Sequence, residues 1–133
     1  PGKERVKVGD MVHVDVMLTN MVGVDSFKFD LNYDQERLQL AMVSRGDLTL
    51  AGNDLLPWDA GAPKPASGRI VGISGRIGEP GKVWGSAATV YFLAKQPGSA
   101  VLSIENLTLL DASGRAITAV PALIPCTVQI SRE

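Results

Sequence analysis

Polar and apolar residues alternate almost without error along residues 24–33, which spell VDSFKFDLNY. Because successive side chains of a β-strand point to opposite faces, this period-two pattern predicts a strand with one dry face and one wet face. The apolar members, which we expect inside, are Phe27, Phe29, Leu31 and Tyr33. The polar members, which we expect to form an outward row, are Ser26, Lys28, Asp30 and Asn32. A long strand that displays a polar row is a candidate recognition surface.

The same alternation recurs along the chain, with turn signals rich in glycine, asparagine, aspartate and proline between the repeats. It predicts further strands over residues 11–20, 38–44, 69–77, 86–95, 101–110 and 123–130. The pattern fails from Gly52 to Gly68, where we expect a long loop with at most one short strand. No segment keeps helical periodicity over three turns. Closely spaced strands separated by turns favour an all-β sandwich of antiparallel strands, and residues 1–133 are expected to form one domain.

The alternation also assigns inner faces to the individual strands. The inner rows that it predicts are Val12, Val14, Val16 and Leu18; Leu38, Leu40 and Met42; Val71, Ile73 and Ile77; and Ala88, Val90, Phe92 and Ala94. In the strand expected at residues 11–20, His13 and Asp15 share the outward face, opposite the apolar row.

Composition and charge narrow the class of partner. A chain of 133 residues that is 45% hydrophobic can bury a sizeable core. A formal net charge of -1 gives no polyanion-binding face, so nucleic acid is not an expected partner. No apolar run approaches the roughly 18 residues that a membrane helix needs. The chain begins with Pro1-Gly2-Lys3 rather than with methionine, so we expect a domain excised from a longer protein whose targeting signals lie elsewhere.

Residues that support catalysis or hold metals are sparse. His13 is the only histidine and Cys126 the only cysteine, and together they cannot supply the three or four ligands of a zinc site. Cys126 falls in an apolar strand and is expected to be a small core residue. The acidic candidates for calcium lack the spacing of an EF-hand loop; they are Asp25, Asp47, Asn53, Asp54 and Asp59. We therefore expect no enzyme, no metal site and no cofactor.

Several motifs, in their order and spacing, resemble those of the cohesin family. They are Val8-Gly9-Asp10 before the strand at residues 12–16, the run at 23–34, Gly46-Asp47-Leu48, the strands at 69–74 and 88–92, and residues 107–111 followed by Gly114. The resemblance implies a nine-stranded antiparallel β-sandwich with jelly-roll topology. It also implies a non-catalytic module for protein–protein interaction, since cohesins bind dockerins, which are calcium-loaded modules of partner proteins.

The resemblance further implies a binding face and a location. Cohesins bind through one flat sheet face, and by position the partner-binding residues would be Ser26, Lys28, Asp30, Ile70, Gly72, Ser74 and Arg76. The four residues of the second strand, from Ile70 to Arg76, would point outward. The protein would be bacterial or archaeal and extracellular or part of the cell envelope, through signals outside this sequence.

Two other functions fit the same sandwich. A carbohydrate-binding module would stack sugars on exposed aromatic rings, and Trp58 and Trp84 are either such platforms or loop anchors packed on the core. A structural domain of an envelope, secretion or pilus component would instead self-associate through an edge strand.

Overall fold

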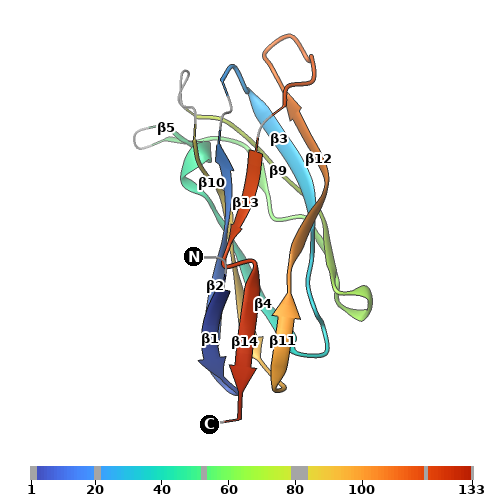
Figure 1. Cartoon of the computed structure of the whole chain (residues 1–133). Helices are drawn as coiled ribbons and strands as arrows, with labels where there is room; N and C mark the ends of the chain where they lie inside the picture. The colour runs from blue at the N-terminus through green and yellow to red at the C-terminus, as the bar shows by residue number, and fades with distance from the viewer. Residues whose placement is uncertain (1–2, 20–21, 52–53, 79–83, 119, 133) are drawn as a thin grey trace.

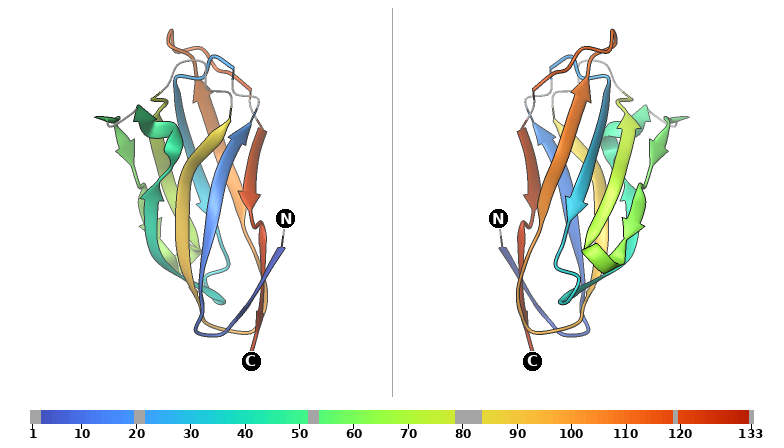
Figure 2. Two further views of the ribbon diagram at one scale, coloured as in Figure 1. Left: turned by 90° about the vertical axis from the view of Figure 1, so that its left-hand side faces the viewer. Right: turned by 90° about the vertical axis from the view of Figure 1, so that its right-hand side faces the viewer.

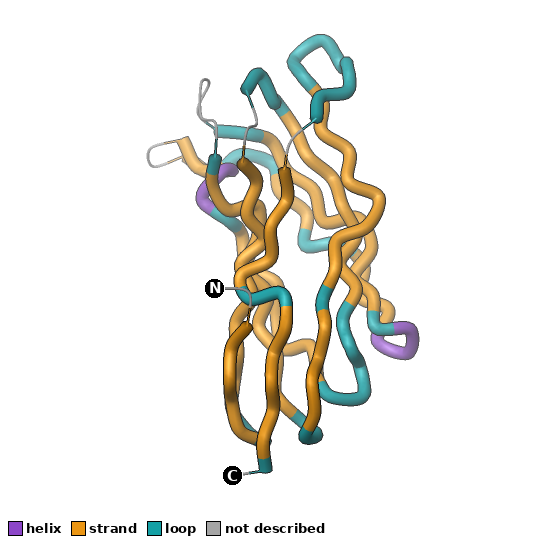
Figure 3. The backbone as a smooth tube through the Cα atoms, in the orientation of Figure 1, coloured by secondary structure: helices purple, strands orange, loops and turns teal. Residues whose placement is uncertain are grey.

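The computed structural model describes residues 3–19, 22–51, 54–78, 84–118 and 120–132, and strands dominate these ranges (Figures 1 and 3). The longer strands are β1 (Lys3–Lys7), β2 (Met11–Thr19), β3 (Ser26–Asn32), β4 (Leu38–Arg45), β9 (Arg69–Arg76), β10 (Gly85–Ala94), β11 (Gly98–Val101), β12 (Ser103–Leu110), β13 (Val120–Ile124) and β14 (Thr127–Ser131). The shorter elements are β5 (Leu50–Ala51), β6 (Asp54–Leu55), β7 (Trp58–Asp59), β8 (Ala62–Lys64) and the 3-10 turns η1 (Asp47–Thr49) and η2 (Pro65–Ser67). The predicted all-β class is confirmed, whereas the expected count of nine strands is not. No helix in the described ranges is long and apolar enough to cross a membrane.

Two sheets form the layers of a sandwich. One has the strand order β13-β2-β10-β4, and the other has the order β12-β3-β9-β7, with β8 also paired to β9. Figure 2 shows them from opposite sides, the first sheet in front on the left and the second in front on the right. A third, small sheet with the order β1-β14-β11 contains a parallel pair, β1 with β14, whereas the pairs of the two main sheets are antiparallel.

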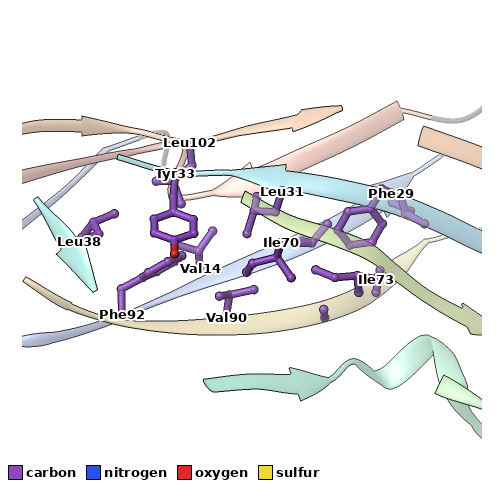
Figure 4. Close-up of a cluster of buried hydrophobic side chains, with 14 of the residues drawn as sticks. Val14, Phe29, Leu31, Tyr33, Leu38, Ile70, Ile73, Val90, Phe92 and Leu102 are labelled. Carbon is purple, nitrogen blue, oxygen red and sulfur yellow. The ribbon is translucent and has the colours of Figure 1, made fainter. Parts of the chain in front are cut away.

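The core lies between the two main sheets (Figure 4). The predicted inner rows of β2, β3 and β10 are buried throughout, which confirms the period-two interpretation of these strands. Tyr33 and Phe92 bring aromatic rings from the two layers together, with centroids 5.0 Å apart. Each large apolar side chain that becomes fully buried stabilises the fold by about 1.5–3 kcal/mol. The well-packed core between the sheets therefore supports their outer faces.

Strand β9 contains a bulge that changes which side chains point outward. Its residues Val71 and Gly72 together lie opposite the single residue Asp30 of β3. Gly72 has a φ of 80°, a conformation that glycine adopts without strain. The extra residue reverses the alternation, so Ile70 is 0% exposed and Val71 lies half-buried on the outer side. The predicted outward position of Ile70 and inward position of Val71 were wrong.

Strand β4 shifts its register against β10 near Ala41. Before the shift, Leu38 is buried and Leu40 packs against the core, as predicted. After it, Val43 takes the inner position and Met42 is 55% exposed. The inward prediction for Met42 was therefore wrong, for the same reason as at Ile70.

Two further expectations need correction. The segment from Gly52 to Gly68 contains β6, β7 and β8, and the last two pair with β9. Cys126 is exposed because it lies in the bend between β13 and β14 rather than in the middle of a strand.

We predict that Gly72→Ala destabilises the domain by about 1–2 kcal/mol, because a β-carbon at this positive φ is strained. The substitution has room, since the nearest atom to an added β-carbon is Cε of Lys28 at 3.6 Å, so backbone conformation alone is tested. Urea unfolding followed by circular dichroism measures the change. Ser74→Ala, two residues along β9, is the matched control and should leave stability nearly unchanged. An unaltered midpoint for Gly72→Ala would contradict the bulge.

Candidate functional site

The outer face of the β12-β3-β9-β7 sheet carries two transverse rows of side chains. The first row is Leu110, Ser26, Arg76 and Pro57, and the second is Thr108, Lys28, Ser74 and Asp59. We call these eight residues the two-row patch. Each row runs across β12, β3 and β9 and ends at β7 or, for Pro57, at the residue just before it, so backbone hydrogen bonds fix its members relative to one another.

The two-row patch borders an open hollow of about 550 Å³. Its centre consists of Ser26 and Ser74 on one diagonal and Lys28 and Arg76 on the other. These are four of the seven residues predicted to bind a partner, and the structure brings them together. Small hydroxyl side chains between two long cationic ones leave space that a partner's side chain can enter.

The other three predicted residues lie outside the hollow. Ile70 is buried in the core and cannot touch a partner, and Gly72 occupies the bulge. Asp30, expected to face solvent, is only 6% exposed. Asp30 alternates with the inward Phe29 and Leu31, as expected, but neighbouring donors cover its carboxylate, so the expected exposure to solvent was wrong.

Three donors converge on the Asp30 carboxylate. Oδ2 accepts hydrogen bonds from Asn106 Nδ2 at 2.8 Å and from an Arg69 guanidinium nitrogen at 2.9 Å. Oδ1 accepts from the backbone N–H of Gly72 at 2.9 Å. The Asn106 hydrogen bond lowers the pKa of Asp30, and so do the Gly72 N–H and the charges of Arg69 and Lys28, against the opposing effect of desolvation. The carboxylate is therefore held ionised beneath the outer face.

Asn106 belongs to a second bulge, in β12. Glu105 pairs with Asp30 and Thr108 pairs with Lys28, so two residues of β12 lie opposite the single residue Phe29 and β12 contains an extra residue at this level. Asn106 has a φ of 55°, and asparagine is among the few residues other than glycine that adopt this region. An asparagine within a strand pattern is a sequence signal for such a bulge, but the alternation of polar and apolar residues alone does not detect it.

The β7 side of the hollow comes from a segment that the sequence pattern predicted as loop. Trp58 points between the layers, where its indole N–H donates to the carbonyl of Ala87 at 3.3 Å. The Arg45 guanidinium lies 5.7 Å from the centre of its ring. Trp58 is thus a loop anchor, and its position fixes Pro57 and Asp59 at the edge of the patch. Trp84, in contrast, is 61% exposed.

The opposite sheet carries His13, exposed and 6.0 Å from the ring of Tyr91. Asp15, its neighbour on the same face, accepts a hydrogen bond from Thr89 Oγ1 at 2.7 Å. Within the described residues no group of three or more His, Cys, Asp or Glu lies close enough to hold a metal ion. Asn53, one of the calcium candidates, lies outside the described residues.

No protein-family model matches the sequence, and neither does any curated protein sequence. Solved structures do match the fold. A chain of a type II cohesin–X-dockerin complex from Acetivibrio cellulolyticus has a TM-score of 0.73 at 16% identity, covering 96% of this chain and 89% of that one. The fold is the cohesin fold. A chain of a type I cohesin–dockerin complex from Clostridium thermocellum gives 0.69 at 18% identity, covering 98% and 95%. A non-cellulosomal cohesin from the archaeon Archaeoglobus fulgidus gives 0.65 at 20% identity, covering 97% and 86%.

We predict that Asp30→Asn lowers the stability of this cohesin-fold domain by about 2–3 kcal/mol at neutral pH, because hydrogen bonds to a charged group are lost. The pKa of Asp30 is lowered on folding, so its contribution is fully present above the ordinary value of 3.8 and disappears as pH falls below it. Urea unfolding across this pH range should therefore show a weaker acid dependence in the variant. Glu36→Gln, at an exposed carboxylate outside this network, is the control. Equal pH profiles for Asp30→Asn and the parent domain would exclude the role of this carboxylate.

Proposed function

We propose that this domain is a non-catalytic docking module that binds a dockerin-type protein through the two-row patch. The observation that carries the proposal is the patch itself. It is a fixed set of side chains, mostly polar or cationic, around a hollow on the outer face of the β12-β3-β9-β7 sheet in a cohesin fold. Two of the similar structures are complexes of cohesins with dockerins, which supports a partner of that class.

The surroundings of the patch favour rigid binding. Ser26 and Lys28 stand on β3, whose inner residues Phe27 and Phe29 are almost fully buried. The Asp30 hydrogen bonds tie the two flanking strands to β3 just beyond the patch. A surface that is ordered before binding loses less conformational entropy when the partner arrives. A sheet built this way supports docking without a conformational change of its own.

The same proposal extends to the setting of the domain. We infer that the partner is calcium-loaded, as dockerins are, and that the domain works outside the cell or in the envelope as part of a longer protein. Trp58 points toward the interior, so Trp84 is the exposed tryptophan of the described residues. One exposed tryptophan offers less surface for stacking sugars than the two that the carbohydrate-binding alternative would use. Protein docking is therefore preferred to carbohydrate binding.

Calorimetric titration with a panel of type I and type II dockerins, first in calcium and then in EDTA, tests the proposal. We expect saturable binding that EDTA abolishes. Ser74→Trp should abolish that binding as well, because a bulky ring would fill the hollow between Lys28 and Arg76.

Ser44→Trp is the matched control, since Ser44 lies on β4 in the other sheet, opposite Thr89. It should bind like the parent domain. Thermal unfolding of both variants establishes that they fold. Absence of heat with every dockerin would reject the docking function, and equal loss in both variants would place binding elsewhere on the domain.

A further inference from the structure

The centre of the two-row patch carries an excess of positive charge. Lys28 is exposed, and no described residue forms an ion pair with it. Arg76 is 58% exposed and contacts Asp25 only at 3.5 Å, at the margin of the patch. Asp59, the acid of the two rows, accepts a hydrogen bond from the backbone N–H of Gly61 at 2.7 Å within its own turn. The two rows thus carry two cations against one acid, and the ion pair of Arg76 with Asp25 is a long one, so positive charge predominates at the hollow.

At the opposite end of the same face, the cation has acidic partners. There Arg69 pairs with Asp30 at 2.9 Å and approaches Glu105 at 3.9 Å. The excess of positive charge therefore lies at the hollow. It does not include Arg69, whose charge is taken up by Asp30 and Glu105.

The register places the two cations where one anion can reach both. Lys28 lies opposite Ser74, and Arg76 lies opposite Ser26, so the cations are diagonal neighbours. Such positions are about 7–8 Å apart in an antiparallel pair, within reach of long side chains. A carboxylate entering between them would also meet the hydroxyls of Ser26 and Ser74, which can donate hydrogen bonds to it.

Apolar groups stand at the ends of the first row. Leu110 lies on the β12 side and Pro57 on the β7 side, and both line the hollow. Neighbouring strands are about 4.8 Å apart and three such spacings separate Leu110 from Pro57, so these two groups lie roughly 14 Å apart, one on each side of the central charge. An acidic group flanked by apolar ones fits this arrangement better than a uniformly charged chain does.

From these contacts we propose that the partner inserts an aspartate or glutamate side chain between Lys28 and Arg76, with apolar partner residues against Leu110 and Pro57. The inference rests on the proposed docking function and adds the chemistry of the residue that anchors the partner. Because charges at an interface act mainly on association rate and specificity, the anchor selects which docking modules are accepted.

Selection from a displayed dockerin library tests this inference. The scaffold is the dockerin of the Clostridium thermocellum complex, with its exposed helical positions randomised, and selection is for calcium-dependent binding to the immobilised domain. We expect binders enriched in one acidic position flanked by apolar ones. Lys28→Glu combined with Arg76→Glu should weaken these binders about tenfold or more, and changing the selected acid to lysine should restore binding to the reversed domain.

The control pair is Lys7→Glu with Lys95→Glu, two exposed cations outside the patch, and it should leave affinity unchanged. Affinity of the parent domain should fall with added salt more steeply than that of the doubly reversed domain. Binders that lack an acid, or that ignore the reversal while still being blocked by Ser74→Trp, would overturn the inference and leave the docking function standing. No calcium-dependent binder at all would overturn both. Saturable binding of soluble alginate that requires Lys28 and Arg76 would replace the protein anchor with an acidic polysaccharide.

Discussion

The ionised carboxylate of Asp30 is the constraint on which the β12-β3-β9-β7 sheet depends. It is almost fully covered, and a covered charge is tolerated only when hydrogen bonds replace the lost water. Its donors come from both neighbouring strands: Gly72 and Arg69 on β9, and Asn106 on β12. Each strand bulges at this level, and a bulge leaves backbone groups without their usual ladder partners. One carboxylate therefore fixes two irregularities that would otherwise weaken the pairing of three strands.

The bulges decide what the outer face presents. If β9 kept Ile70 inside and all its residues alternated without a bulge, Ser74 and Arg76 would also turn inward. In β12, the extra residue near Asn106 likewise returns Leu109 to the core and turns Thr108 outward. The two-row patch exists because a bulge in each flanking strand, β9 and β12, shifts its alternation by one residue near Asp30. Local irregularity beneath the sheet thus produces a regular array of side chains on its surface.

The sequence predicted the uniform strands well and failed where alternation is interrupted. Period two located the inner rows of β2, β3 and β10 because these rows are long and unbroken on the inner face. The wrong assignments of Ile70, Val71 and Met42 result from register shifts that the pattern does not count. Gly72 within a strand was a visible signal of the shift. Strand β7 had none, since two residues carry no period, and its position depends on the tertiary hydrogen bond of Trp58 to Ala87.

Within one sheet, the same kind of side chain has two roles, and the surrounding groups separate them. Arg69 is committed to the carboxylate of Asp30, so its charge is used inside the fold. Arg76 is more exposed and has only a long contact with Asp25, so its charge remains available at the surface. A cation that already has a close partner gains little from a second one, whereas an unmatched cation must either stay hydrated or meet an anion. On the proposed docking face, where the neighbours Ser26 and Ser74 are small, we therefore expect Lys28 and Arg76 to be the groups that distinguish one partner from another.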